Sequence, residues 1–474
     1  MSRRPTYPEP DKRSRETIRA MAQAEERFLE AREEKRECEC KEGMFPRDSS
    51  TSRRQFLSAS AAIAGGGMVS FLDRPAAAAT PAGAVEYPIQ KDSTKEPGRG
   101  TGVDGGYGSR SQFETEERWR FPTKTLGSSW TMTPLPKGQG IVTPSGLHFE
   151  RHHGGIPNLD PAKHTLVVHG MVKNAMKYTV ADLKRFPSVS RFHFIECSGN
   201  TFSEWRGSFL KTAQATHGLT STSEWTGVQL STILREVGVK EGAAWILAEG
   251  ADAAVMTRSI PIEKCWDDAI LAYAQNGEAL RPEQGYPLRL LLPGFEGNTN
   301  IKWLRRLDIS DKPFMTREET SKYTDFMSNG KARQFTFTMG AKSVITFPSG
   351  EMKLPGPGFY EVGGLAWSGR GRITRVEVST DGGKTWELAS LQEPALPLCH
   401  TRFRFPWRWG GGPAVLMSRC QDETGYVQPT VQQLVEARGL KGHPKFGSIY
   451  HNNRIQAWAV GSDGSVTNGN SSIA

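Results

Sequence analysis

The chain has 474 residues, of which 37% are hydrophobic and 23% charged, enough for two or three soluble domains with sizeable cores. No segment is apolar over the length that a stable membrane span needs. The formal net charge of +9 comes without a basic low-complexity arm, so the composition disfavours nucleic-acid binding. It favours either the attraction of small anions or an ordinary solvated basic surface.

The N-terminal residues have the pattern of an export signal. Residues 1–51 form a charged leader extension in which Glu, Arg and Lys recur at helical spacing. Residues 52–79 contain Arg53 and Arg54, then a short Gly-rich apolar run and an Ala-rich stretch, the layout of a twin-arginine signal peptide. This pathway exports folded proteins, mostly those that receive a cofactor in the cytoplasm. We therefore expect a periplasmic protein, and Met44 is an alternative start with an ordinary short leader.

The next two segments differ in composition and in hydrophobic pattern. Residues 80–130 are rich in Ala, Pro, Gly and Lys, which predicts a linker or extended arm. Over residues 131–330, short strands alternate with helical pieces, which indicates a mixed α+β domain. We expect strands at 165–170, 191–196, 244–248 and 287–292, and helices at 180–186 and 230–237.

Residues 331–474 read as a second domain with almost no helical signal. Turns rich in Gly, Pro and Asp, such as 381–384, separate its apolar runs. Strands are expected at 335–339, 373–378, 415–418 and 455–460. This spacing is typical of an immunoglobulin-like β-sandwich.

Six cysteines are present, and two of them, Cys38 and Cys40, lie in the predicted leader extension. The other four share no C-x-x-C spacing, and because no C-x-x-C-H occurs we expect no covalent haem in this chain. Cys197 follows a predicted strand and opens a loop with a glycine two residues on. A thiolate in that position suits a soft metal ion. The alternative is an inert cysteine that is buried as a small apolar side chain.

Two further clusters carry chemistry. Arg151, His152 and His153 precede a Gly-Gly-x-Pro turn, and their side chains can bind an oxyanion or adjust a metal site. Arg289 and Lys302 flank a predicted strand and a Gly-rich loop, as a phosphate-bearing cofactor requires. A strand with ordinary surface bases explains the second cluster equally well.

Taken together, six segments resemble the sulfite oxidase family of molybdopterin enzymes over about residues 147–460. Within that family they are most similar to the molybdenum subunits of the periplasmic sulfane or sulfite dehydrogenases of the Sox system. The segments are 151–157, 194–197, 281–289, 317–324, 364–371 and 421–429. The resemblance implies a mixed α/β molybdopterin-binding domain followed by an immunoglobulin-like dimerisation domain, an α+β fold overall.

The resemblance also implies roles for single residues. Cys197 matches the cysteine whose thiolate binds molybdenum beside the two dithiolene sulfurs of molybdopterin. Arg151 matches an arginine at the substrate mouth, and His153 a histidine near the cofactor. Tyr323 matches the active-site tyrosine, and Arg438 a C-terminal arginine that helps bind sulfur oxyanions.

Further matches concern the cofactor and the substrate. Asp252, Arg289 and Lys302 match contacts to the pterin or its phosphate. Thr201 stands in a region where sulfite-oxidising relatives are basic, and Gln284 where many relatives have histidine, which favours a larger carrier-bound substrate. The Ser-Gly pair after Cys197 resembles the sulfite enzymes instead, so both substrates stay open.

The implied function is periplasmic, molybdenum-dependent oxidation of sulfite or carrier-bound sulfane sulfur. Its electrons pass to a separate c-type cytochrome, and the implied assembly is a homodimer or a heterotetramer with that cytochrome. One alternative is a molybdopterin sulfoxide reductase of the same fold, although neutral sulfoxides do not need Arg151 and Arg438. The non-enzymatic alternative is an immunoglobulin-like binding protein with an inert Cys197.

Overall fold

The computed structural model describes residues 113–121, 127–205, 207, 210–326, 330–438 and 451–470. The described residues from 116 onward belong to one compact unit. The predicted leader extension and signal peptide lie outside the described residues, as do Cys38, Cys40 and Met44. No helix among the described residues combines the length and the apolar character that crossing a membrane requires.

Ordered strands begin before residue 131, where we had predicted the start of the first domain. A small antiparallel sheet joins β1 (Trp119–Phe121), β2 (Ser129–Met132) and β3 (Glu150–His152) in that order. β1 and part of β2 thus lie in the segment predicted as linker. The rings of Phe121 and Trp130 stack with centroids 4.9 Å apart, a local packing that the Gly-rich composition of the surrounding residues concealed.

The first large sheet has the strand order β5-β4-β13-β8-β9, with β4 and β13 parallel and the other pairs antiparallel. Its strands are β4 (Thr165–Gly170), β5 (Met176–Thr179), β8 (Trp245–Gly250), β9 (Thr257–Pro261) and β13 (Leu304–Ser310). The second sheet runs β11-β10-β7-β6, and β12 pairs with β10. Its strands are β6 (Ser188–Glu196), β7 (Thr220–Gln229), β10 (Ile270–Gln275), β11 (Glu278–Ala279) and β12 (Arg289–Leu291).

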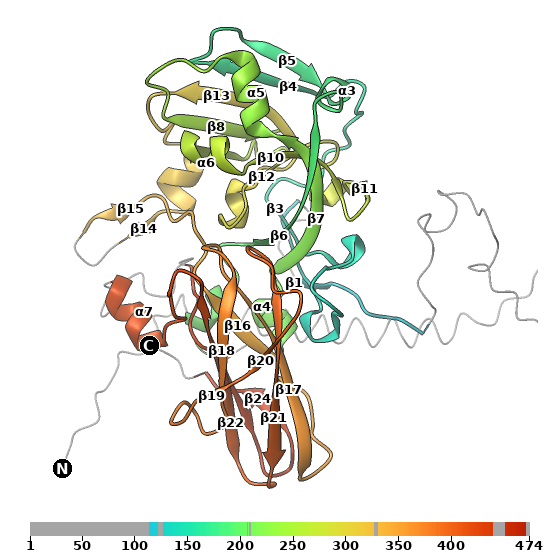
Figure 1. Cartoon of the computed structure of the whole chain (residues 1–474), viewed down its shortest axis with the longest axis vertical. Helices are drawn as coiled ribbons and strands as arrows, with labels where there is room; N and C mark the ends of the chain where they lie inside the picture. The colour runs from blue at the N-terminus through green and yellow to red at the C-terminus, as the bar shows by residue number, and fades with distance from the viewer. Residues whose placement is uncertain are drawn as a thin grey trace, which may run out of the picture. The chain divides into compact units, whose positions relative to one another are not determined.

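Helices join the two sheets into one core. The helix predicted at 230–237 is α5 (Leu230–Val237), and it ends at Gly238 in the left-handed conformation with φ 66°. Buried residues of α5 and of α6 (Ile262–Asp267) belong to the same hydrophobic cluster as residues of both sheets. Figure 1 shows the two helices beside the strands of these sheets. The other elements are α3 (Val180–Leu183), α4 (Ala213–His217), η2 (Leu135–Lys137), η3 (Ser145–Leu147), η4 (Phe202–Trp205), η5 (Pro282–Gln284), η6 (Gly297–Thr299), the π-helix η7 (Glu318–Lys322), β14 (Asp325–Phe326) and β15 (Ala332–Arg333).

The C-terminal domain is the predicted β-sandwich, in which two antiparallel sheets share one hydrophobic core. One sheet has the order β16-β17-β21-β20, and the other β19-β18-β22-β23-β24. The strands are β16 (Lys342–Phe347), β17 (Gly358–Trp367), β18 (Ile373–Ser379), β19 (Glu387–Leu388), β20 (Ser390–Gln392), β21 (Thr401–Trp409), β22 (Ala414–Asp422), β23 (Ala457–Val460) and β24 (Val466–Asn468). One helix, α7 (Val431–Arg438), follows β22.

The strand predicted at 335–339 was wrong. These residues make one isolated bridge, from Phe295 to Thr338, and belong to none of the sheets described above. Phe337 stacks on Phe295 with centroids 5.1 Å apart, and Phe335 stacks on Phe337 at 5.2 Å. The alternating aromatic pattern therefore reflects packing against the first domain and not a strand ladder.

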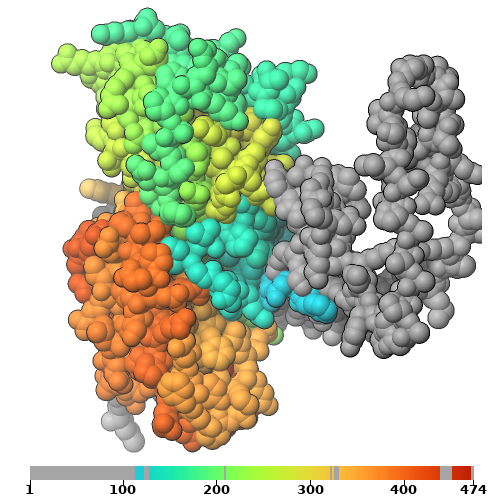
Figure 2. Space-filling model, turned by 45° about the vertical axis from the view of Figure 1, so that its right-hand side comes forward, coloured from blue at the N-terminus to red at the C-terminus, as the bar shows by residue number. Residues whose placement is uncertain are grey.

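Both domains contact the segment that follows β2. Arg402 of β21 donates hydrogen bonds to the carbonyl oxygens of Gly138 and Gly140. Figure 2 shows this teal segment against the orange residues of the C-terminal sheets. The segment thereby links the sandwich to β3, which carries Arg151.

Candidate active site

One pocket collects residues that are far apart in the sequence. It is lined by β3 and the residues after it, by the end of β6, by the loop from Gly297 to Trp303, and by Tyr323 after the π-helix η7. Seven of the eight residues that we selected from the sequence line it. They are Arg151, His153, Cys197, Asp252, Arg289, Lys302 and Tyr323.

Cys197 is placed by the end of β6. Its backbone N–H donates to the carbonyl of Leu219 at 2.9 Å, and its thiol is free of any disulfide. Burial raises the pKa of Cys197, while the Arg151 guanidinium and a hydrogen bond from Gly199 act in the opposite direction. A thiol held in this way loses its proton when it binds a metal ion.

Arg151 brings a positive charge beside that thiol. Its guanidinium lies 5.1 Å from the ring centroid of Trp130, and it donates to Ser128 Oγ at 3.4 Å and to the carbonyl of His152. Among the described residues, no carboxylate lies within ion-pairing distance of Arg151. Burial lowers the pKa of Arg151, yet an arginine side chain stays charged, so its charge is available to an anionic ligand.

Tyr323 faces the same pocket and approaches His153. The Tyr323 hydroxyl lies 3.2 Å from His153 Nε2. Burial raises the pKa of Tyr323 further above its usual value, and the nearby Cys197 adds to this effect. The phenol therefore keeps its proton at neutral pH and can donate a hydrogen bond to an oxygen atom in the pocket.

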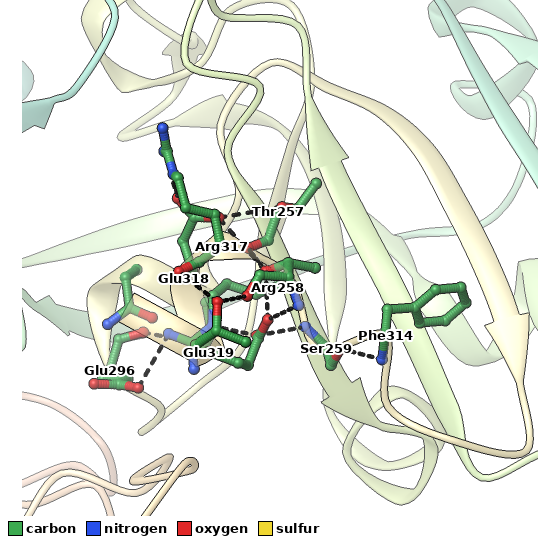
Figure 3. Close-up of polar contacts among 12 residues, drawn as sticks. Thr257, Arg258, Ser259, Glu296, Phe314, Arg317, Glu318 and Glu319 are labelled. Carbon is green, nitrogen blue, oxygen red and sulfur yellow. Dashed lines mark hydrogen bonds and ion pairs between the residues drawn. The ribbon is translucent and has the colours of Figure 1, made fainter. Parts of the chain in front are cut away.

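A buried cluster of charged side chains contacts the ring of Tyr323, and it was not predicted from the sequence. The Arg258 guanidinium lies 5.2 Å from the Tyr323 ring centroid. Its Nε donates to Glu319 Oε1 at 2.8 Å, and its Nη1 donates to Glu296 Oε1 at 3.2 Å (Figure 3). Glu319 also accepts hydrogen bonds from the backbone N–H groups of Ser259 and Thr316, at 2.9 Å each. Arg258 therefore ties η7 to the loop that begins at Glu296.

A second network joins Lys302 to β3. Lys302 Nζ donates to His152 Nδ1 at 2.8 Å, to the Arg151 carbonyl at 3.1 Å and to the Glu283 carbonyl at 2.9 Å. His152 Nε2 lies 2.5 Å from Glu150 Oε2. Burial, followed by the charge of Arg289, lowers the pKa of Lys302 from 10.5 to about 7. A negatively charged ligand would favour its protonated form.

Glu150 was not selected from the sequence, because its cationic partners Arg118 and Lys302 are distant along the chain, although His152 is only two residues away. Burial alone would raise its pKa, but the hydrogen bond to His152 and the charge of Arg118 outweigh burial and lower it from 4.5 to about 2. Burial and the charge of Lys302 lower the pKa of His152 from 6.5 to about 4. His152 belongs to the Arg-His-His cluster that the sequence indicated as able to bind an oxyanion or adjust a metal site.

Arg289 and Asp252 complete the selected set within the pocket. Arg289 donates to the carbonyls of Gln284, at 3.0 Å, and Asn300, at 3.3 Å. Burial lowers its pKa from 12.5 to about 9. Asp252 Oδ1 accepts from the backbone N–H of Met256 at 3.0 Å.

The pocket also contains buried polar atoms without a protein partner. Arg289 Nε, His148 Nε2 and Asn298 Oδ1 find no hydrogen-bond partner among the described residues, and all three side chains line the pocket. Buried polar groups normally have a partner, so these atoms indicate a polar ligand. Together with the Cys197 thiol and the cationic Arg289 and Lys302, they fit a pterin with an anionic phosphate and a metal bound to one thiolate.

The eighth selected residue belongs to helix α7. Arg438 is the last residue of α7, and its side chain is outside the described part of the chain. The catalytic and cofactor-binding roles given above, including that of Arg438, stay predictions.

Comparison with known families gives the class of protein. Residues 153–318 match the oxidoreductase molybdopterin-binding domain, and residues 333–457 match the Mo-co oxidoreductase dimerisation domain. The sulfane dehydrogenase SoxCD structure from Paracoccus pantotrophus is 45% identical, with a TM-score of 0.73, and the match covers 81% of this chain and 99% of that one. The chain belongs to the sulfite-oxidase-type family of molybdopterin oxidoreductases, which confirms the resemblance found in the sequence.

Curated relatives include plant nitrate reductases. Those of Hordeum vulgare and Solanum lycopersicum are each 33% identical, over 58% and 57% of this chain. The chain spans about a third of the length of these relatives, 34% and 33% respectively. Membership of an oxidoreductase family sets aside the interpretation as a non-enzymatic binding protein.

Proposed function

We propose that this protein oxidises an inorganic sulfur species, sulfite or carrier-bound sulfane sulfur, at a molybdenum–molybdopterin cofactor. The observation that carries the proposal is Arg151, a cation beside Cys197 with no carboxylate partner among the described residues. An anionic sulfur oxyanion gains from such a charge in a partly dry pocket. A neutral sulfoxide gains much less, so the sulfoxide reductase alternative is weaker.

The residues of this chain have separate tasks in the proposal. Cys197 would hold the metal through its thiolate, while Arg289, Lys302 and Asp252 would orient the pterin and its phosphate. The bound cofactor supplies the two-electron redox chemistry that side chains lack. Arg151 binds and orients the anion, and the protonated Tyr323 phenol donates a hydrogen bond to it, with His153 in contact with the phenol.

The comparisons support sulfur over nitrate as the substrate class. The sulfane dehydrogenase is 45% identical and is matched over 99% of its length, whereas the nitrate reductases are 33% identical and are matched over about a third of theirs. The proposal further includes export by the twin-arginine pathway, a periplasmic site of action, a c-type cytochrome as acceptor and a homodimer or heterotetramer. Arg53 and Arg54 support the export and the periplasmic site of action, and the dimerisation-type second domain supports the homodimer. The cytochrome follows from the resemblance and from the lack of a C-x-x-C-H sequence for covalent haem.

The experiment uses the full chain purified from cells that make molybdopterin. We expect molybdenum near one atom per chain, and reduction of added cytochrome c by sulfite or by a carrier-bound persulfide. Nitrate and dimethyl sulfoxide, each offered with reduced viologen, serve as competing substrates, and Cys197→Ala serves as the metal-site control. Molybdenum-containing protein that reduces nitrate or sulfoxide but oxidises neither sulfur substrate would overturn the proposal.

Export is tested separately in the native host. We expect the Arg53→Lys, Arg54→Lys double variant to remain in the cytoplasm with its cofactor, while the parent reaches the periplasm. A double variant that is exported as well as the parent would contradict the twin-arginine part of the proposal.

A further inference from the structure

The loop that carries Cys197 is held by the C-terminal domain. Glu196, the residue before Cys197, is fully buried and lies at the end of β6. Its Oε1 accepts a hydrogen bond from Lys342 Nζ at 2.5 Å, and its Oε2 accepts one from Trp367 Nε1 at 2.8 Å. Lys342 begins β16 and Trp367 ends β17, so both donors come from the sandwich. Lys342 is itself fully buried.

Thr201, in the same loop after Cys197, also forms hydrogen bonds with the C-terminal domain. Thr201 has φ 64°, a left-handed conformation that a β-branched residue rarely adopts. Lys342 Nζ donates to Thr201 Oγ1 at 3.3 Å, and Asn452 Nδ2 donates to the Thr201 carbonyl at 3.1 Å. Thr201 Oγ1 also donates to the carbonyl of Asn452. Such a conformation persists only where its surroundings impose it, and here part of those surroundings belongs to the C-terminal domain.

The opposite side of the loop is closed by the first domain. A Cβ on Gly297 would lie 2.8 Å from the Glu196 carbonyl oxygen and 3.2 Å from Cys197 Cα, so the two backbones are in close contact. Asn200 Nδ2 donates to Glu196 Oε1 at 3.0 Å, and Asn200 Oδ1 accepts from the Leu219 N–H at 3.2 Å. The Cys197 loop is therefore fixed between the η6 loop and β16.

We propose that Lys342, acting through Glu196, is a positioning residue for Cys197, so that the second domain completes the metal site within one chain. This goes beyond a role in dimerisation, and it rests on the proposed function. Removing Lys342 would leave the buried Glu196 carboxylate without its cation, and an uncompensated buried charge is strongly unfavourable. The loop then shifts or loosens, and the thiol leaves the position that binds the metal.

The experiment compares variants of the full-length holoenzyme. Lys342→Met removes the cation, and the Glu196→Gln, Lys342→Met double variant removes both charges. Lys211→Met is the matched control, because Lys211 also pairs with a glutamate of the sandwich, Glu351, but at 3.7 Å and with side chains 60% and 52% exposed. Molybdenum content, kcat per molybdenum, KM for sulfite, the Mo(V) resonance spectrum and deuterium exchange of residues 197–205 are measured in each.

For Lys342→Met we expect kcat per molybdenum to fall at least tenfold, KM for sulfite to change less than threefold, and the Mo(V) spectrum to shift. Exchange of the 197–205 amides should accelerate at least tenfold. Lys211→Met should match the parent in every measurement. A purely structural role would lower the folded yield but leave kcat per molybdenum and the spectrum of the folded fraction unchanged.

The double variant keeps the test decisive if Lys342→Met does not fold. The double variant carries no unpaired charge, so it should fold. Because it lacks the Lys342–Glu196 ion pair, its amide exchange and kcat per molybdenum should still differ at least threefold from the parent. Parental exchange and parental kcat per molybdenum in the folded variant would overturn the inference. A parent protein without molybdenum would instead overturn the proposed function, while the exchange measurement would still decide whether Lys342 holds the loop.

Discussion

Replacing Arg258 with methionine tests whether the charge cluster behind Tyr323 holds the site together. Arg258 is fully buried, and its guanidinium contacts the carboxylates of Glu319 and Glu296 and the ring of Tyr323. Removing one partner of a buried ion pair costs about 3–5 kcal/mol, because the remaining charge has lost its compensation. The backbone donors of Ser259 and Thr316 still bind Glu319, so we expect the lower part of this range.

The assay is urea unfolding followed by tryptophan fluorescence, with kcat for sulfite measured on the same samples. The control is Arg404→Met, which breaks an ion pair with Glu361 at 3.4 Å where both side chains are 56% exposed. An exposed pair of this kind contributes less than about 1 kcal/mol. We expect Arg258→Met to unfold at clearly lower urea and to lose kcat, because Tyr323 shifts. If the two variants unfolded within about 1 kcal/mol of each other, the buried cluster would not have the assigned energetic role.

Three further predictions concern the site. Cys197→Ala should fold normally but contain little molybdenum and lose turnover by at least about a thousandfold; substantial residual activity would remove the ligand role. Arg438→Gln should raise KM for sulfite by roughly ten- to a hundredfold, since a hydrogen bond to a charged group contributes about 1.5–3 kcal/mol; an unchanged KM would place Arg438 outside the site. Because the Glu150 pKa falls from 4.5 to about 2 on folding, Glu150 contributes about 3 kcal/mol that is present above pH 4.5 and lost as the pH falls toward 2. Glu150→Gln should therefore be less stable at pH 7 and show a flatter loss of stability in acid, and an unchanged slope in urea unfolding between pH 4.5 and 2 would contradict this assignment.

Several features of the fold could be predicted because they depend on neighbours along the chain. Apolar residues at 230, 233, 234 and 237 predict a helix with one apolar face, and α5 has these bounds and ends at Gly238. The strand before Cys197 was likewise readable from its alternation. The segment 335–339 has the same alternation, yet its aromatic side chains pack in a tilted contact with Trp245 and stack on Phe295 instead of forming a ladder. A local pattern cannot distinguish these outcomes, since both bury alternate side chains.

By itself, the sequence determined the family, the order of the two domains and seven of the residues that share the pocket, because these residues stand in short motifs whose residue types and spacing can be read along the chain. Only the tertiary structure decided which charges face one another. The contacts from Arg258 to Glu296 and Glu319, from Lys302 to His152, and from Lys342 to Glu196 join residues 38 to 150 positions apart. The physical reason is that pairing of buried charges depends on distance in space and on exclusion of water, and neither quantity is written in the local sequence.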